Sequence, residues 1–402
     1  MDPRFSRILI GLWAAIIILV APYISPIATG VLGVAFAIFL YFAVKIRYFA
    51  IATAVISLLY GISFIPILAL TAPIAMILVG ELVRVAFKKF GHDMLFFGIG
   101  STLALVFVML YTASAEPLVG ALAETALLML RSILTNRKDG SMLSLIGVAM
   151  IITLFMDLEI LVDMQLLAFA ILLCAAFGYF AFRAKTIDMS GLFSLILFGV
   201  ILIVCTRGFW WFFIVLAFFI LGSLFTKFKY SRKAAMGVAQ KKSGRRGYKN
   251  AFANAGVAVV ACVLYAITAS PVWAVVFLAS IATATADTMA SEIGVISKRK
   301  PVMITTLRPC EPGVNGGVSL AGELACIAGS AIIAVLGFAF GIVPAWGAAA
   351  AFIAGFLGTN FDSLIGALVE NKGHCGNAGT NLMATLFGGL VGAGIFLLAA
   401  LL

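Results

Sequence analysis

The chain has 402 residues, of which 64% are hydrophobic and 11% are charged, and its net charge is +11. Apolar runs of about 20 residues, the length that crosses a bilayer as a helix, recur from end to end. The runs are continuous rather than alternating, which excludes a β-barrel, and so we predict an all-α polytopic membrane protein with about 14–15 transmembrane helices and no soluble domain.

Residues 1–163 form the first predicted domain, a transmembrane bundle of unknown role with short loops and few polar residues inside the spans. Its spans are predicted at 8–24, 27–44, 48–64, 66–83, 94–113, 115–133 and 142–160. The first run lacks a small-residue cleavage site, so we expect a membrane span rather than a removed signal peptide.

Residues 164–402 form the second predicted domain, with spans at 165–182, 190–206, 208–226, 251–269, 272–290, 317–341, 345–368 and 381–401. Three longer polar loops, 227–250, 291–316 and 369–380, interrupt these spans. Polar groups near a membrane helix are costly and usually functional, so we expect the chemistry in this half.

Lysine and arginine gather in alternate loops, which indicates that the N-terminus and the three polar loops are cytoplasmic and that the protein lies in the cell membrane. This distribution explains the net charge of +11 without a nucleic-acid partner, and phosphorylated ligands are a second explanation.

The six cysteines are scattered and form no CxxC pair, so neither a disulfide framework nor a zinc site is indicated. No Walker A, GxSxG or HExxH motif is present, and any nucleotide site must be of another kind.

The loop "KFKYSRKAAMGVAQKKSGRRGYKN" at 227–250 holds nine basic residues and no acid. Arginine presents a planar fork that fits phosphate oxygens, and lysine presents a compact charge. Lys242, Arg245 and Arg246 are therefore candidates for binding phosphate. The alternative is a membrane anchor that touches anionic headgroups. Asn254 shares a helix face with Asn250 just beyond this loop.

The stretch "ATATADTMASEIG" at 282–294 places Asp287, Glu292 and four hydroxyls at the end of an apolar run. Gly294 is predicted to end this helix. A glycine-rich loop follows and can present backbone N–H groups to a phosphate, while a carboxylate beside it can hold Mg²⁺. The alternative is a pair of acids neutralised by the neighbouring "SKRK", with glycines for close helix packing. The candidates in the loop are Gly313, Asn315, Gly316, Gly317 and Ser319.

Asp362 lies inside the last apolar run but one, in "GTNFDSLIGA". A carboxylate in that position needs a partner or a cation, so we predict that it acts with Asp287. The alternative is an interhelical hydrogen bond.

Together these stretches resemble the integral-membrane family once described as domain of unknown function ninety-two, which includes plant plastid phytyl-phosphate kinase. The matching stretches occur in family order over roughly residues 180–402. They are "FFILGSLFTKFK" (218–229), "GRRGYKNAFANAGV" (244–257), "ATADTMASEIG" (284–294), "ITT" (304–306), "PGVNGGVSLAGELA" (312–325) and "DSLIGA" (362–367) with the later Asn381. One departure is Asn315, where the family often has threonine.

The resemblance implies phosphoryl transfer from a nucleoside triphosphate, with CTP expected, to an isoprenoid monophosphate of phytyl or geranylgeranyl type. For such a reaction we predict that Asp287, Glu292 and Asp362 are catalytic and that Asp287 and Asp362 hold Mg²⁺. The predicted cofactor-binding residues are Lys242, Arg245, Arg246, Asn254, Gly313, Asn315, Gly316, Gly317 and Ser319.

Two other functions stay open from the sequence. A polytopic transporter would use the acids as a cation path, but we find no internal repeat and the polar loops lie on one side. A cytidylyltransferase that joins CMP to a lipid phosphate would share the metal and glycine chemistry. The isoprenoid chain length, the nucleotide and the oligomeric state are not indicated.

Overall fold

The structure, a computed structural model, describes residues 3–134, 136–158, 160–240, 244–399 and 401. The chain divides into two compact units, Met1–Met164 and Gln165–Leu402. Within the described residues, 13 helices are long and apolar enough to cross a bilayer, and two shorter apolar helices accompany them. The predicted all-α polytopic membrane fold is confirmed.

The described residues of the first unit form seven long helices and three short helical turns. The long helices are α1 (Pro3–Val20), α2 (Pro26–Phe39), α3 (Arg47–Gly61), α4 (Ile67–Ala86), α5 (Asp93–Tyr111), α6 (Pro117–Leu134) and α7 (Gly140–Asp157), and the turns are η1 (Ala21–Tyr23), η2 (Leu40–Val44) and η3 (Lys88–Phe90). Glu124 of α6 accepts a hydrogen bond of 2.7 Å from Ser101 Oγ of α5. The acid within this span therefore has a partner on a neighbouring helix.

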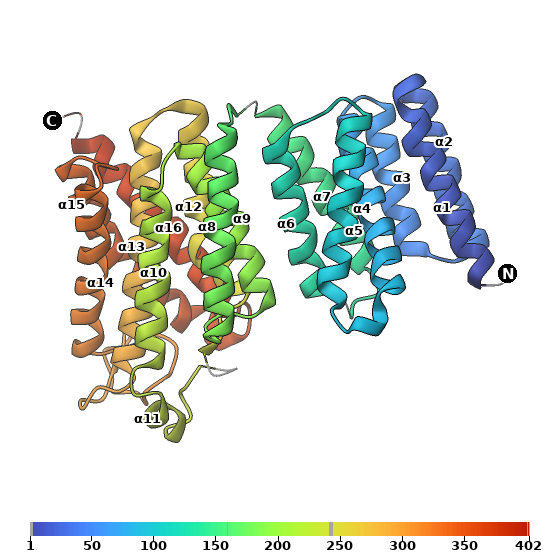
Figure 1. The fold of residues 1–402 in the computed structure, drawn as a ribbon. Coiled ribbons are helices and arrows are strands. Elements are labelled where there is room, and N and C mark those ends of the chain that lie inside the picture. The colour runs from blue at the N-terminus through green and yellow to red at the C-terminus, as the bar shows by residue number, and fades with distance from the viewer. Residues whose placement is uncertain (1–2, 135, 159, 241–243, 400, 402) are drawn as a thin grey trace. The chain divides into compact units, whose positions relative to one another are not determined.

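The second unit holds the remaining long helices and the longest loops. Its helices are α8 (Met164–Arg183), α9 (Met189–Thr206), α10 (Trp210–Lys227), α11 (Tyr230–Ala235), α12 (Tyr248–Thr268), α13 (Pro271–Gly294), α14 (Leu320–Ala339), α15 (Ala345–Leu368), η5 (Glu370–Lys372) and α16 (Asn377–Ala399), and its strands are β1 (Val302–Met303) and β2 (Gly317–Val318). In Figure 1, α11 and the loops before α12 and α14 gather at one end of this unit's helices.

Helix α13 is the centre of the second unit, because 83% of its span is buried and it packs against α10, α12, α14, α15 and α16. Small residues permit this packing: a Cβ added at Gly388 of α16 would lie 2.0 Å from Thr283 Oγ1. The hydroxyls of Thr283 and Thr285 donate to carbonyl oxygens one turn back in α13. These two threonines are therefore satisfied by their own helix.

Local signals set the ends of these helices. Helix α13 ends at Gly294, as predicted. Helix α14 begins at Leu320 rather than at the predicted 317, because the Ser319 side chain accepts a hydrogen bond of 3.2 Å from Gly322 N and caps the helix. The basic loop contains the short helix α11, which was not predicted.

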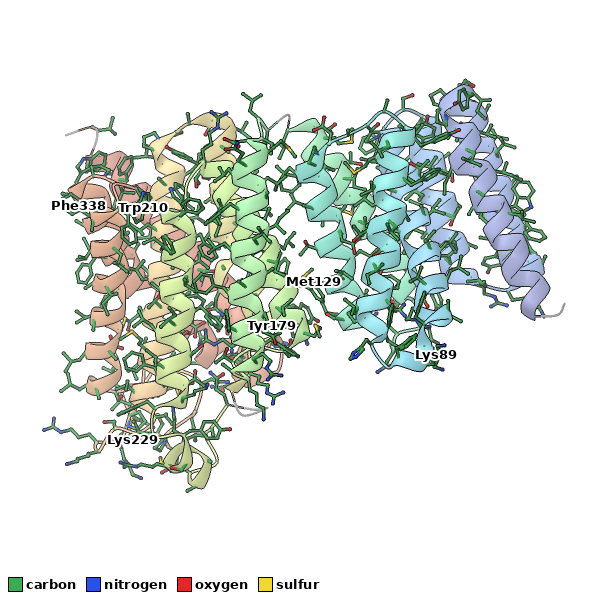
Figure 2. The ribbon with its side chains drawn as sticks, viewed as in Figure 1. Lys89, Met129, Tyr179, Trp210, Lys229 and Phe338 are labelled. Carbon is green, nitrogen blue, oxygen red and sulfur yellow. The ribbon has the colours of Figure 1, made fainter. Side chains whose placement is uncertain are left out.

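The two ends of the second unit differ in chemistry. Figure 2 shows Lys229 at the end where α11 and the loops lie, and Trp210 and Phe338 toward the opposite end. Trp210 stacks on Phe340 with ring centroids 4.7 Å apart. Tryptophan is enriched at membrane–water interfaces, so this arrangement is typical of an integral membrane protein.

Candidate active site

A polar cavity lies at the loop-bearing end of the second unit. Its walls come from the ends of α13, α14, α15 and α16, from the loop 312–319, and from the segment that leads into α12. Its volume is about 1090 Å³ with its opening included. The predicted site residues that line it are Arg246, Asp287, Gly313, Asn315, Gly316, Gly317, Ser319 and Asp362.

Four other predicted residues do not belong to the described lining. Arg245 is exposed, and Glu292 and Asn254 are buried outside the lining of the cavity. Lys242 lies outside the described residues.

Two carboxylates from different helices face the cavity, Asp287 of α13 and Asp362 of α15. They interact electrostatically with each other and with Glu370. In the described part of the chain none of the three forms an ion pair. Oδ1 of Asp362 is buried and has no hydrogen-bond partner among the described residues. An unpaired buried carboxylate oxygen is costly, so this arrangement favours a bound cation.

The two carboxylates fit a Mg²⁺ site that is completed by phosphate oxygens and water better than a metal site built from protein ligands alone. The described residues contain no group of three or more His, Cys, Asp and Glu that could hold a metal ion. Mg²⁺ commonly takes one or two protein carboxylates and completes its shell with phosphate oxygens and water. Asp287 and Asp362 would supply that number of ligands.

The glycine loop 312–319 lies directly beside the carboxylates. Gly313 and Gly316 have φ of 87° and 85°, a conformation that favours glycine. A Cβ added at Gly316 would lie 2.5 Å from the Cβ of Ala367, so the loop needs glycine to approach α15. Asn371 Nδ2 donates to the Asn315 carbonyl oxygen at 3.0 Å, and β2, which lies within the loop, pairs with β1. The loop is thus held in place at Asn315 and at Gly317–Val318.

Arg246 is a buried cation at the cavity wall, with 6% of its surface exposed. The backbone N–H of Arg246 donates to the backbone carbonyl of Thr186 at 2.9 Å, and the backbone carbonyl of Arg246 accepts from the backbone N–H of Asp188 at 3.0 Å. The guanidinium lies 5.4 Å from the Phe218 ring centroid. Its Nε and Nη1 have no hydrogen-bond partner in the described chain. These free donors suit phosphate oxygens.

The charge of Arg246 persists at neutral pH. Burial lowers the pKa of Arg246 to about 10, and the carboxylate of Glu292 opposes that shift. The side chain is therefore protonated at pH 7, where a phosphate ligand is ionised.

Glu292, unlike Asp287, forms an ion pair within the described part of the chain. Lys233 of α11 forms an ion pair with Glu292 and also donates to the carbonyl oxygens of Phe225 and Thr226, each at 2.9 Å. Lys233 is 1% exposed and Glu292 is 5% exposed. The pair attaches α11 to the end of α13, and the catalytic role predicted for Glu292 stays a prediction.

Lys233→Met is expected to lower the free energy of unfolding by about 3–5 kcal/mol, because it leaves the Glu292 carboxylate buried without its closest cation. The double variant Lys233→Met/Glu292→Gln is expected to regain most of that loss. Thermal melting in detergent measures both variants, and Lys249→Met, at an exposed lysine of α12, is the matched control. A double variant no more stable than Lys233→Met would show that the two side chains are not coupled.

A chain of asparagines joins α12 to α16 beside the cavity. Asn381 Nδ2 donates to Asn254 Oδ1 at 3.3 Å, and Asn254 Nδ2 donates to the Asn250 carbonyl at 2.9 Å. Asn250 and Asn381 line the cavity. Asn254 lies behind them, so a role in binding would act through its two neighbours.

Glu323 and Glu370 also line the cavity and were not among the predicted site residues. Glu323 accepts a hydrogen bond of 3.2 Å from Asn360 Nδ2, and Glu370 accepts one of 3.4 Å from Thr380 Oγ1. An acid in the first turn of a helix, such as Glu323, has an ordinary explanation in the helix dipole. The signal that could have identified both acids is their position at the same predicted membrane face as Asp287.

Residues 172–389, more than half of the chain, match the family described as integral membrane protein DUF92. The chain belongs to this family. The resemblance predicted from the sequence is thus confirmed, and the match begins a few residues earlier than expected.

Several relatives of known sequence share part of the chain. An uncharacterized membrane protein of Synechocystis is 38% identical over 162 residues, which cover 40% of this chain and 63% of the relative. One of Methanocaldococcus jannaschii is 31% identical over 243 residues, or 60% of this chain and 99% of the relative. The chloroplastic protein VTE6 of Arabidopsis thaliana is 31% identical over 166 residues, or 40% of this chain and 50% of the relative. No solved structure matches the chain.

Proposed function

We propose that the chain transfers a phosphoryl group from CTP to an isoprenoid monophosphate in the membrane, giving the isoprenoid diphosphate and CDP. The polar cavity is the observation that carries the proposal. It brings Asp287, Asp362, the glycine loop and the free donors of Arg246 together at one end of a membrane bundle. The chain's membership in the DUF92 family supports the same chemistry, because the sequence resemblance described above is to a family that includes plant plastid phytyl-phosphate kinase.

The transfer needs no covalent bond to the protein. A phosphate oxygen of the isoprenoid monophosphate forms a bond to the γ-phosphorus, and the bond from that phosphorus to the bridging oxygen breaks. The nucleoside diphosphate leaves with the electron pair. Catalysis of such a step rests on positioning the reactants in line and on stabilising negative charge.

The residues of the cavity divide this work. Arg246 binds phosphate oxygens through its fork, and the backbone of the 312–319 loop supports the triphosphate. Asp287 and Asp362 would hold Mg²⁺, which when bound offsets the charge of the phosphate oxygens and orients them. The cavity lies at the end of the membrane helices, so an acceptor can present its phosphate there while its hydrocarbon stays among them.

The proposal includes an orientation. The loop-bearing end of the second unit faces the cytoplasm, where nucleoside triphosphates are found, and the N-terminus lies on the same side. The support is the gathering of basic residues in the loops at 227–250 and 291–316.

A direct assay tests the proposed function. Purified protein in detergent is given Mg²⁺, one of the four common nucleoside triphosphates, and phytyl or geranylgeranyl monophosphate. We expect isoprenoid diphosphate and nucleoside diphosphate, formed fastest with CTP and abolished by EDTA. Formation of CDP-lipid and pyrophosphate would instead assign a cytidylyltransferase. Absence of product with all four triphosphates, together with substrate flux in proteoliposomes without nucleotide, would assign a transporter.

A further inference from the structure

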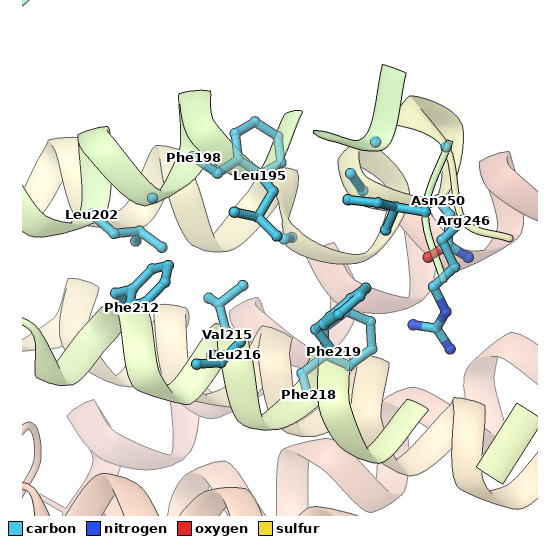
Figure 3. Close-up of a pocket in the computed structure, with 16 residues that line it drawn as sticks. Leu195, Phe198, Leu202, Phe212, Val215, Leu216, Phe218, Phe219, Arg246 and Asn250 are labelled. Carbon is cyan, nitrogen blue, oxygen red and sulfur yellow. The ribbon is translucent and has the colours of Figure 1, made fainter. Parts of the chain in front are cut away.

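An apolar groove runs between α9, α10 and α12 of the second unit, next to the polar cavity. Its volume is about 630 Å³ with its open side included. Figure 3 shows apolar side chains of α9 and α10 facing each other across it. Those side chains include Leu195, Phe198, Leu202, Val215, Leu216 and Phe219.

The groove is continuous with the candidate active site. Arg246 and Asn250 line both the groove and the polar cavity. Figure 3 shows Arg246 and Asn250 at one end of the groove and Leu202 and Phe212 at the other. The guanidinium passes across Gly222 of α10, where an added Cβ would lie 2.5 Å from Arg246 Nη2. A ligand with an anionic head and an apolar body matches both ends of this space.

The groove also connects sideways to the outer surface of the helices. A second apolar space between α8 and α10, of about 790 Å³, shares Leu195, Leu216 and Phe219 with the groove. Two of its other lining residues, Phe180 and Leu224, are 68% and 60% exposed. In a membrane that surface contacts lipid, so a hydrocarbon tail can enter without crossing water.

We propose that this groove holds the hydrocarbon tail of the acceptor lipid, with its phosphate at Arg246, and that the end at Leu202 and Phe212 sets the length of tail that fits. The inference rests on the proposed function and adds to it the site of the acceptor. From Gly191, which adjoins the Arg246 carbonyl, to Leu202 the α9 backbone rises roughly 16 Å at 1.5 Å per residue. A longer tail must leave through the opening between α8 and α10.

Photolabelling of the unmodified protein tests the location of the tail. The probe is farnesyl monophosphate with a diazirine at the end of its tail, and labelled residues are mapped by mass spectrometry. We expect labels on Leu202, Phe212 or Val215, which unlabelled geranylgeranyl monophosphate removes by competition. Labels confined to the outer surfaces of other helices, unaffected by competition, would overturn the proposal.

Val215→Phe tests the groove as a determinant of tail length, because it fills the middle of the groove from a half-buried position. We expect the Kd for geranylgeranyl monophosphate to rise at least tenfold, while the thermal shift caused by CTP is unchanged. Val260→Phe, the same change at a position of α12 that is 59% exposed, is expected to change neither. Equal Kd values for the two variants would contradict the tail site.

The two proposals fail separately. Diphosphate formation with labels outside the groove would remove the tail site and leave the kinase activity. Labels in the groove without turnover of any triphosphate would remove the kinase activity and leave a lipid-phosphate site.

Discussion

Asp287→Asn is expected to reduce kcat for isoprenoid diphosphate formation by roughly 10²–10³-fold, the loss that follows removal of one charge-stabilising group from an active site. The change keeps the size of the side chain and removes its negative charge. Asp287 faces the cavity from the buried helix α13. A cation shared with Asp362 would lose one of its two protein ligands.

Two measurements separate this effect from unfolding. The thermal melting temperature of Asp287→Asn is expected to equal or exceed that of the parent, because the variant removes one of three mutually repelling carboxylates. Asp157→Asn, at an exposed position near the end of α7, is the matched control and should keep full activity. Parent-like turnover by Asp287→Asn would exclude a metal-binding role for this carboxylate.

The helices were largely predictable because the membrane imposes their length. An apolar run of about 20 residues has few alternatives to a spanning helix, since lipid offers no partner for backbone groups. Short elements have no such constraint. Helix α11 has six residues and β1 and β2 have two each, and none of them shows a periodic pattern long enough to identify.

Those parts of the candidate site whose residues lie close together in the sequence were predictable. Asp287 and the 312–319 loop belong to the matching stretches 284–294 and 312–325, which are near each other in the sequence, and the structure places them around one cavity with Asp362. Asp287 faces the cavity and Glu292 does not, although both lie in the stretch 282–294, whose composition predicts the same role for both. Five residues of α-helix turn by about 500°, so the two acids point in directions roughly 140° apart. Lys233 reaches Glu292 because α11 packs against the end of α13, a tertiary contact that the sequence pattern does not predict.

The adjacent residues Arg245 and Arg246 show the same limit. Both belong to "SGRRG", and their composition predicts the same role for each. The backbone of Arg246 bonds to Thr186 and Asp188, and that bridge directs its side chain inward. Arg245 is exposed. A backbone contact with residues 58 or more positions earlier therefore determines which arginine is buried. The local sequence around the two arginines does not predict that contact.

Arg246→Gln is expected to lower kcat/KM for the isoprenoid monophosphate by roughly 10²-fold, because it removes a buried charge that would bind the phosphate directly. Arg246→Lys should recover only part of this loss. Lysine keeps the charge but cannot present two parallel N–H groups to phosphate oxygens, and its strongly hydrated ammonium is costlier to bury beside Phe218. Binding of CTP, measured by thermal shift, should change less than acceptor binding in both variants.

Arg245→Gln distinguishes specific binding of phosphate by the buried guanidinium of Arg246 from non-specific attraction of phosphate by the positive charge of the loop. An exposed charge attracts anionic lipid only over a screened distance, so its removal should cost a few-fold at low salt and almost nothing at 0.15 M salt. The effect of Arg246→Gln should persist at both salt concentrations, because the guanidinium is 6% exposed and poorly screened. Equal, salt-sensitive losses for the two arginines would show that the loop attracts phosphate without a specific site, and the assignment of Arg246 would be wrong.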